Sequence, residues 1–400
     1  MNMKAEILDE VEEIDLLVTQ QANELSAMLH EHRMEMFPPD AQKTLRPFQL
    51  AEVAGYLGVT SGYLKNLSLE GKGPLPMVTP SGRRSYTAQQ MLEMRHFLDR
   101  NGRGGRYVPH RKEGEHLQVI AVVNFKGGSA KTTTAAHLAQ HMALTGHRVL
   151  AIDLDPQASL SALYGYQPEI DHNESLYEAL RYDDQRKPLS ALVKRTNFPG
   201  LDVVPANLEL QEYEYDTPLA LARNDGSMGR IFFGRLDEAL ADVADDYDIV
   251  VIDCPPQLGY LTLTALSSST GVLITVHPQM LDVMSMCQFL IMMGEVMGTL
   301  KRAGANMRLD WLRYLVTRYE PTDGPQSQMV AFMRAIFKQH VLVNEMLKST
   351  AISDAGITKQ SLYEVERSQF TRATYDRAME SLNRVNGEIV DLVHKAWRRH

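Results

Sequence analysis

Cysteine is scarce in this sequence: Cys254 and Cys287 are the only two among 400 residues. So small a number excludes a disulfide framework and fits a reducing cytoplasm. No apolar run approaches the length that we expect of a membrane span, and the acidic N-terminus does not resemble a signal peptide. The charged fraction of 23% and the apolar fraction of 44% are ordinary for a soluble protein, and the length predicts two or three folding units.

Charge is unevenly distributed along the chain. Residues 1–40 contain ten acidic and two basic side chains, whereas residues 41–112 contain twelve basic and four acidic ones. The remainder is acidic, and the whole chain has a formal net charge of −9. A basic segment between acidic ones is the electrostatic pattern expected of a module that binds DNA.

Residues 1–40 predict a separate helical unit. Its apolar positions alternate spacings of four and three residues, which makes a heptad seam with one polar break. The seam consists of Ile7, Val11, Ile14, Val18, Gln21, Leu25 and Met28. Self-association through this helix would place two DNA-reading heads on one palindromic operator, and the alternative is a helix that docks on its own body. The pair Pro38–Pro39 ends the helix.

Residues 41–105 have the order of a winged helix-turn-helix domain. The segment 48–57 predicts a short helix with one apolar side. A tight turn follows at Gly58–Thr60, where Thr60 caps a second helix over Ser61–Leu69. The second helix is the one that we expect to enter the major groove of DNA.

A wing and a linker complete this domain. The stretches Gly71–Pro76 and Ser81–Tyr86 predict a β-wing, and Thr87 caps a helix that runs to about Leu98. Asn101–Arg106 predicts a flexible basic linker. The arrangement is similar to winged modules of the MerR type, and the alternative is a helical bundle with a solvated basic face. The candidate DNA contacts are Ser61, Tyr63, Lys65 and Asn66 on the second helix and Arg83 and Arg84 on the wing.

A glycine-rich segment, Lys126–Thr133, directly follows the apolar run Val119–Asn124. A buried strand, a glycine turn and a helix form the context of a phosphate-binding loop, although such a motif also arises by chance. Its second lysine, Lys131, would reach the β- and γ-phosphates, and the Thr132 hydroxyl would coordinate Mg²⁺. The first lysine, Lys126, lies too far back to duplicate this role. We therefore expect it to reach the nucleotide of a second subunit.

Ala130 departs from the common loop pattern, in which glycine precedes the lysine. If the position needs a positive φ, alanine costs roughly 1 kcal/mol or more there. We therefore expect a working but slow ATPase, which suits a switch better than a motor.

Two further apolar runs, Val149–Asp153 and Ile249–Asp253, end in aspartates. In open α/β sheets ligands bind at the carboxyl ends of the strands, so three strands would deliver phosphate or metal groups to one site. Further strand signals occur at Asp202–Pro205, Gly271–Val276 and Leu312–Thr317. The fold class is α/β, with a mostly parallel sheet covered on both faces over residues 106–400. For Asp153 and Asp253, the alternative is helix capping.

The motif order resembles the ParA/MinD group of deviant Walker ATPases. The matching elements are Lys-Gly-Gly-x-x-Lys-Thr from Lys126, Asp-Leu-Asp-Pro-Gln from Asp153 and Asp-Cys-Pro-Pro from Asp253. The second element is similar to the ParA partition branch, and a long N-terminal extension with a DNA-binding module resembles the large plasmid ParA proteins. Over nearly the whole chain the sequence resembles the RepA proteins of the repABC replicons.

The resemblance implies roles for single residues. Lys126, Lys131 and Asp155 would be catalytic, with Lys126 acting across a dimer and Asp155 positioning the attacking water. Thr132, Asp153 and Asp253 would form the Mg²⁺ site. The residues expected to bind ATP or ADP are Gly127, Gly128, Ser129, Ala130, Lys131, Thr132, Thr133, Asp253 and Pro278. His277, beside Pro278, is expected to be structural rather than catalytic.

By resemblance the function would be plasmid or secondary-replicon partition. ATP would close a homodimer that binds nonspecific nucleoid DNA in the cytoplasm, a ParB/RepB-type centromere-binding partner would stimulate hydrolysis, and the N-terminal domain would repress its own operator. The alternatives are a nucleotide-sensing repressor without a partition role and a membrane-positioning ATPase of the MinD kind. Candidates for the nonspecific DNA surface are Arg334, Lys338, Lys348, Lys359, Arg367, Arg372 and Arg377.

The remaining features are interpreted more plainly. A related iron–sulfur reductase family shares a cluster through two cysteines per subunit, but a buried small apolar side chain is the preferred interpretation of both Cys254 and Cys287. A membrane-binding tail at Ala396–His400 is disfavoured because the preceding helix carries acidic residues. The acidic, tyrosine-rich segment Gln211–Asp216 has no chemistry that the sequence identifies.

Overall fold

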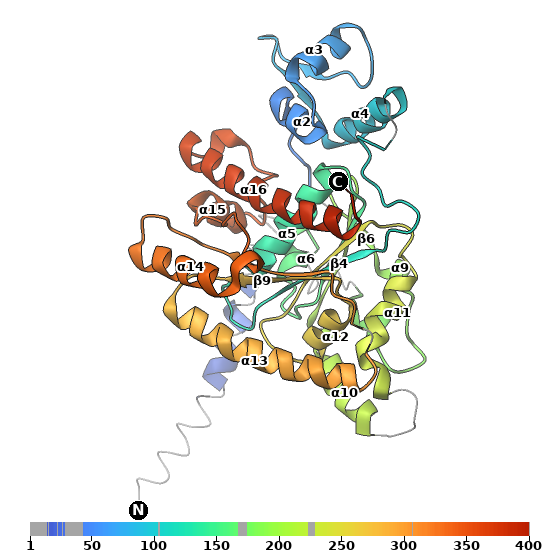
Figure 1. The fold of residues 1–400 in the computed structure, drawn as a ribbon, viewed down its shortest axis with the longest axis vertical. Helices are drawn as coiled ribbons and strands as arrows, with labels where there is room; N and C mark the ends of the chain where they lie inside the picture. The colour runs from blue at the N-terminus through green and yellow to red at the C-terminus, as the bar shows by residue number, and fades with distance from the viewer. Residues whose placement is uncertain are drawn as a thin grey trace, which may run out of the picture. The chain divides into compact units, whose positions relative to one another are not determined.

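A computed structural model of the chain describes residues 14, 16–21, 23–25, 27, 28, 43–102, 105–166, 174–222, 229–305 and 307–399 (Figure 1). The chain divides into two compact units, Met1–Lys43 and Thr44–His400. In the first unit the described residues between 14 and 28 are helical and exposed. Those of the predicted seam are Ile14, Val18, Gln21, Leu25 and Met28, while Ile7, Val11 and the Pro38–Pro39 pair lie outside the described residues.

The second unit begins with a small helical module. Its helices are α2 (Leu50–Leu57), α3 (Ser61–Leu69) and α4 (Ala88–Asn101), and its strands are β1 (Phe48–Gln49), β2 (Met77–Val78) and β3 (Arg84–Tyr86). The strands form an antiparallel sheet in the order β1-β3-β2. The Thr60 hydroxyl accepts the Tyr63 N–H at 3.2 Å, and Thr87 forms a capping box with Gln90. The predicted caps of α3 and α4 are therefore confirmed.

Two details of this module differ from the expectation. Phe48 is not helical but pairs with Tyr86 between β1 and β3, because both aromatic side chains are buried in the module's core. Asn101 belongs to α4 rather than to a linker, and the Asp99 carboxylate accepts the N–H groups of Gly105 and Tyr107, each at 3.0 Å. The described end of the predicted linker is thus held by hydrogen bonds.

A seven-stranded sheet organises the rest of the unit, in the order β10-β9-β4-β8-β5-β7-β6. Its strands are β4 (Gln118–Val123), β5 (Val149–Asp153), β6 (Lys194–Arg195), β7 (Leu201–Val204), β8 (Ile249–Asp253), β9 (Gly271–Val276) and β10 (Trp311–Val316). All neighbouring strands are parallel except β6, an edge strand that pairs antiparallel with β7. The predicted α/β class with a mostly parallel sheet is confirmed.

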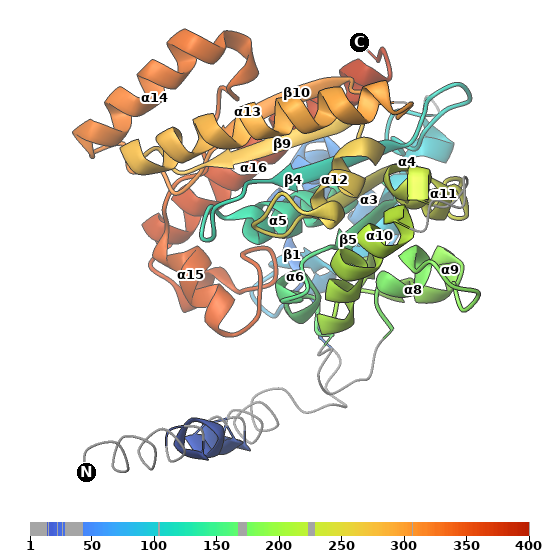
Figure 2. The same cartoon turned by 90° about the horizontal axis from the view of Figure 1, so that it is seen from below.

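Helices cover both faces of this sheet, as Figures 1 and 2 show. One face carries α5 (Lys131–Leu144), α6 (Ser159–Leu163), α15 (Thr350–Ile357) and α16 (Arg372–Ala396). The other carries α8 (Tyr177–Leu180), α9 (Leu189–Leu192), α10 (Glu212–Ala222), α11 (Arg235–Ala241), α12 (Tyr260–Ser268), α13 (Met280–Arg302) and α14 (Gly324–Phe337). Successive β4 side chains alternate between two cores, Ile120 and Val122 in one and Ala121 and Val123 in the other. A strand buried on both faces is expected to be a nearly continuous apolar run, which is the pattern of residues 119–123 of β4.

The core of the small module is continuous with the core around α5 and α16, since one buried cluster extends from Phe48 to Trp397. The short helices η1 (Leu208–Gln211), η2 (Gly229–Gly234), η3 (Lys338–His340) and η4 (Arg367–Gln369) complete the described elements. The segment Gln211–Asp216 lies mostly in α10, where the Glu214 carboxylate accepts the N–H groups of Tyr260 and Leu261 at 2.8 and 2.9 Å. Glu214 therefore caps the N-terminus of α12, a structural role that the sequence did not indicate.

Helix α13 bears on the expectation that no apolar run approaches the length of a membrane span. Among the described helices it alone is long and apolar enough to cross a membrane by length and composition, and 22% of that window is buried. Its inner side, with Met286, Phe289 and Met293, packs in the core beneath the sheet. Its composition is therefore that of a covering helix with an apolar outer side, and by itself it is weak evidence for a membrane span.

Candidate nucleotide-binding site

The glycine-rich segment forms the connection between β4 and α5, at the carboxyl end of the central strand. Lys131 is the first residue of α5, so the helix N-terminus faces the loop. Gly128 has φ +77° and Ala130 has φ +65°. Ala130 therefore adopts the left-handed conformation that alanine disfavours, as the sequence analysis anticipated.

The loop is braced by the ends of β9 and β10. The Asn124 amide donates to Thr275 O at 2.5 Å, and its Oδ1 accepts the Lys126 N–H at 3.0 Å. The Thr275 hydroxyl donates to Ser129 Oγ at 3.1 Å. On the other side, Thr317 Oγ1 donates to Ser129 O at 3.0 Å and Arg318 donates to Gly128 O at 3.2 Å. Sequence reasoning did not assign Asn124 and Thr275 this role, because their partners are distant along the chain.

The two loop lysines have different surroundings. Lys131 is 7% exposed, and its ammonium contacts Lys126 O at 3.4 Å. Burial lowers the pKa of Lys131, and the nearby charges of Asp253 and Asp155 oppose that shift. Lys126 has a half-exposed side chain that forms an ion pair with Asp282 on α13. One lysine therefore lies inside the site and the other at its rim.

Asp153 has the hydrogen bonds of a helix cap. Its Oδ2 accepts the Ser161 N–H at 2.8 Å and the Ser161 hydroxyl at 2.7 Å, and its Oδ1 accepts the Asp155 N–H at 3.2 Å. Ser161 belongs to the first turn of α6. Burial raises the pKa of Asp153, and these hydrogen bonds oppose the shift. The contacts of Asp153 are thus those of the helix-capping alternative, and the residue also borders the candidate metal site.

Asp253 is different, because both of its buried oxygens lack a hydrogen-bond partner among the described residues. It is the direct neighbour of Asp153 across β5 and β8. Burial and the Asp153 charge raise the pKa of Asp253 well above its usual range, and the Thr132 side chain and the Lys131 charge partly offset this. An unpaired buried carboxylate beside a hydroxyl is the oxygen donor set that Mg²⁺ takes, so these residues fit the expected metal.

Asp155 lies two residues beyond β5 and is partly exposed. Its Oδ1 accepts the Gln157 N–H at 3.0 Å, and its carbonyl accepts the Ala158 N–H at 2.8 Å. The Asp155 side chain therefore has its place fixed by a tight turn and keeps one oxygen available for a water molecule.

Two cavities flank the loop. One of about 370 Å³ is lined by Gly128, Ala130 and Thr133 together with Arg318 and the segment Met346–Ser349. Another of about 320 Å³ is lined by residues 126–129, His277, Gln279 and Asp282. Pro278 lines neither of these cavities but a third one of about 480 Å³ between α13 and α14.

The candidate DNA residues lie on the surface of the small module. Tyr63, Lys65 and Asn66 occupy the exposed side of α3, while Leu64 and Leu67 face the core and Ser61 is partly exposed in its first turn. Arg83 is exposed in the β2–β3 connection, and Arg84, in β3, donates to Gly82 O at 3.4 Å. The structure therefore brings a helix and a hairpin tip to the surface, with Arg84 less free than Arg83.

Arg95 connects this module to the phosphate-loop helix. Its guanidinium donates to Tyr107 O at 3.1 Å, to Leu144 O at 2.9 Å and also to Tyr56 O. Leu144 is the last residue of α5, whose first residue is Lys131. Arg95 is 4% exposed, and burial lowers its pKa to about 10. One helix thus extends from the phosphate loop to the small module.

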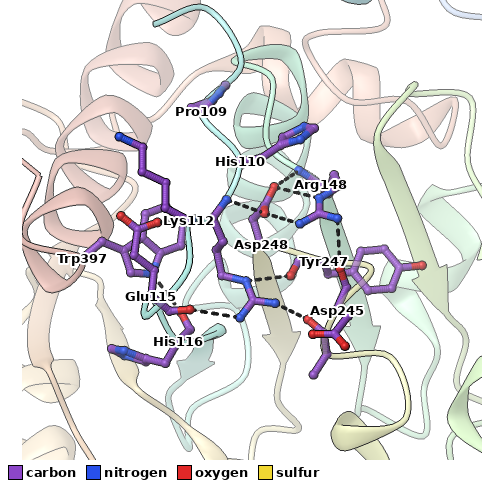
Figure 3. Close-up of polar contacts among 12 residues, drawn as sticks. Pro109, His110, Lys112, Glu115, His116, Arg148, Asp245, Tyr247, Asp248 and Trp397 are labelled. Atoms are coloured by element: carbon purple, nitrogen blue, oxygen red, sulfur yellow. Dashed lines mark hydrogen bonds and ion pairs between the residues drawn. The ribbon is translucent and has the colours of Figure 1, made fainter. Parts of the chain in front are cut away.

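The segment between the small module and the seven-stranded sheet is held to the sheet by Asp248 (Figure 3). The Asp248 carboxylate accepts the backbone N–H groups of Arg111 and Arg148, each at 2.8 Å, and pairs with the Arg148 guanidinium at 2.7 Å. Burial raises the pKa of Asp248, but these partners outweigh burial and hold it below its usual range. In the same view Trp397 lies against this connecting segment, and its Nε1 donates to His116 O at 2.9 Å. Trp397, in the segment where a membrane-binding tail is disfavoured, therefore packs on its own protein.

Other candidate residues are differently placed from expectation. Cys254 is buried, as expected, but Cys287 is exposed on the outer side of α13, so the interpretation of Cys287 as a buried residue is wrong. At least four of the seven C-terminal basic candidates pair with carboxylates: Arg334 with Glu345, Lys348 with Glu320, and Arg367 and Arg372 with Asp376. A basic DNA surface built from all seven would therefore be partly neutralised.

A phosphate loop between a central parallel strand and a helix, with carboxylates at neighbouring strand ends, defines a P-loop nucleotide-binding protein. Residues 117–304 match the family model AAA_31, described as an AAA domain. A replication protein A of Sinorhizobium fredii (strain NBRC 101917 / NGR234) is 66% identical over 385 residues, which cover 96% of this chain and 95% of that protein.

The chromosome partitioning protein ParA of Myxococcus xanthus is 33% identical, covering 56% of this chain and 73% of that protein. Among solved structures, cobyrinic acid a,c-diamide synthase from Mycobacterium smegmatis with bound ATP analogue and magnesium has a TM-score of 0.50 and 31% identity, covering 58% of this chain and 86% of that one. The chain belongs to the ParA/MinD family of deviant Walker ATPases. Within it, the similarity to replication protein A extends over nearly the whole length.

Proposed function

We propose that this chain is a partition ATPase of a plasmid or secondary replicon, in which ATP closes a homodimer that binds DNA without sequence preference. The observation that carries the proposal is the pair of loop lysines. Lys131 is buried against its own phosphate site, whereas Lys126 is half exposed at the rim, where a second subunit can reach it. The similarity to a chromosome partitioning protein and to a replication protein A supports the same function.

The loop residues would act by position and charge. The backbone N–H groups of residues 127–133 and the α5 N-terminus surround the phosphates of ATP or ADP, and the 370 Å³ cavity with its apolar Met346 and Ile352 suits the base. Thr132 and Asp253 would hold Mg²⁺, with Asp153 behind them, and the metal would neutralise phosphate charge. Asp155 would orient the attacking water.

The small module would bind the protein's own operator in the cytoplasm. Its support is the order helix, turn, capped helix and β-hairpin, with α3 and Arg83 exposed together on a basic segment. A centromere-binding partner of the ParB/RepB kind would stimulate hydrolysis and release the dimer from nucleoid DNA. Ala130, with its positive φ, favours slow ATP turnover when this partner is absent.

The test is binding to random-sequence DNA without nucleotide, with ADP and with ATP, at two salt concentrations. We expect binding that requires ATP, weakens steeply with salt through counterion release and is lost in Lys126→Gln. Lys301→Gln, at the far end of α13, is the matched lysine control and should bind like wild type.

Binding indifferent to nucleotide and to Lys126 would overturn the proposal and leave a dedicated operator-binding regulator. ATP-dependent recruitment to lipid vesicles, without DNA binding, would instead favour the MinD kind of ATPase.

A further inference from the structure

Lys126 has a carboxylate partner in its own subunit. Its ammonium forms an ion pair with Asp282 Oδ1, and His277 Nδ1 lies 3.2 Å from the other oxygen, Oδ2. The Lys126 side chain is 46% exposed and the Asp282 side chain only 10%. The carboxylate is therefore a fixed anchor, and the lysine is the movable partner.

Asp282 owes its fixed place to the start of α13. Gln279 is the N-cap of this 23-residue helix, and the Asp282 N–H donates to Gln279 O at 3.0 Å. A carboxylate in the first turn is stabilised by the helix dipole and the unpaired N–H groups there. His277, at the end of β9, fixes the second oxygen, so the anchor is held from two elements.

The ion pair lies inside the cavity beside the phosphate loop. Lys126, Asp282, His277 and Gly128 all line the same 320 Å³ space, together with Arg318. In this conformation the Lys126 ammonium is turned toward its own α13, and its charge is neutralised there. A lysine held this way cannot at the same time contact the phosphates of another subunit.

We propose that Asp282 is a positioning residue that retains Lys126 in the unassembled subunit and sets the protein concentration at which ATP closes the dimer. The proposal rests on the proposed function, in which Lys126 acts across the dimer. Closure exchanges the Asp282 carboxylate for nucleotide phosphates as the partner of Lys126, once in each subunit.

The size of the effect follows from the exposure of the pair. Partly exposed ion pairs shift an equilibrium by up to about fivefold. Because two subunits release one pair each, removal of the carboxylate should favour the dimer by up to about 25-fold in its association constant.

The test uses the full-length protein with Asp282→Asn, which keeps shape and removes charge, and Asp282→Glu, which keeps charge. Glu295→Gln, an exposed carboxylate on the same helix, is the matched control. Without nucleotide, amine labelling of Lys126 followed by mass spectrometry should rise several-fold in Asp282→Asn and stay near the wild-type level in the other two. A general loosening of the fold would raise labelling at Lys301 as well.

With ATP, sedimentation should show the Asp282→Asn dimer at about tenfold lower protein concentration than wild type. Asp282→Ser, which still suits a first helical turn, should behave in the same way and serves if Asp282→Asn does not fold. Unchanged labelling of Lys126, or a dimer that is unchanged or weaker in both variants, would overturn the inference.

The Lys126→Gln protein separates this inference from the proposed function. If Lys126→Gln still dimerises and binds DNA with ATP, the proposed function fails. If Lys126→Gln loses both properties while Asp282→Asn matches wild type, only the role of Asp282 fails.

Discussion

Two buried aspartates respond to pH in opposite directions. Asp253 has a raised pKa, caused first by burial, so its charge destabilises the nucleotide-free fold increasingly as pH rises above about 4. Asp248 has a lowered pKa because its arginine and backbone partners outweigh burial, so its stabilisation is complete at neutral pH and is lost only as pH falls below about 4.

The matched variants are Asp253→Asn and Asp248→Asn, compared by urea unfolding without nucleotide from pH 4 to pH 8. Asp253→Asn should raise the free energy of unfolding by about 1 to 3 kcal/mol at neutral pH, and this advantage should shrink toward pH 4. Asp248→Asn should lower it by about 3 kcal/mol, with little change over the same range. Parallel pH profiles for the two variants would contradict both assignments.

Ala130 offers a substitution that should stabilise the chain. Ala130→Gly removes a left-handed strain of about 1 to 2 kcal/mol, and the added freedom of the unfolded chain returns about 0.4 to 1 kcal/mol. A net gain of about 0.5 kcal/mol is expected in thermal unfolding. Gly128→Ala, also at positive φ, is the reversed control and should lose stability, and equal signs for the two would refute the strain argument.

At the scale of elements, Arg95 is the link between α4 and α5. Arg95→Ala leaves three carbonyls without their donor and should lower the free energy of unfolding by about 2 to 4 kcal/mol. Arg100→Ala, exposed on the same helix, should change it by less than about 0.5 kcal/mol. The comparison is made by urea unfolding, and a similar small loss in both variants would show that Arg95 is not an anchor.

At the scale of the whole molecule, the apolar seam of the first unit predicts self-association without nucleotide. Val18 and Leu25 are 59% and 60% exposed within the chain. Val18→Asp should convert a nucleotide-free dimer into a monomer in sedimentation experiments, because a charge enters the seam. Leu16→Asp changes a more exposed residue off the seam, 72% exposed, and should remain dimeric. A monomeric wild type would favour the alternative, a helix that docks on its own body.

Local patterns predicted local structure well. The bounds of β5, β8, β9 and α3 agree with the apolar runs and with the Thr60 cap, because each depends on neighbours within a few residues. The antiparallel edge strand β6 has only two residues, Lys194 and Arg195, and neither carries a strand signal. The helix predicted at Phe48 is wrong because the conformation of Phe48 is decided by its pairing with Tyr86, which is distant in the sequence.

The sequence by itself determined the phosphate-loop motif, the apolar strands that precede Lys131 or end at Asp153 and Asp253, and the α/β class, since these depend on short-range periodicity and motif chemistry. Only the tertiary structure decided that Asp153 caps α6 while Asp253 stays unpaired, although both end apolar strands. It alone joined Arg95 to Leu144 and Lys126 to Asp282, pairs separated by 49 and 156 residues. Such contacts depend on how elements pack, and a single sequence carries no local signal for them.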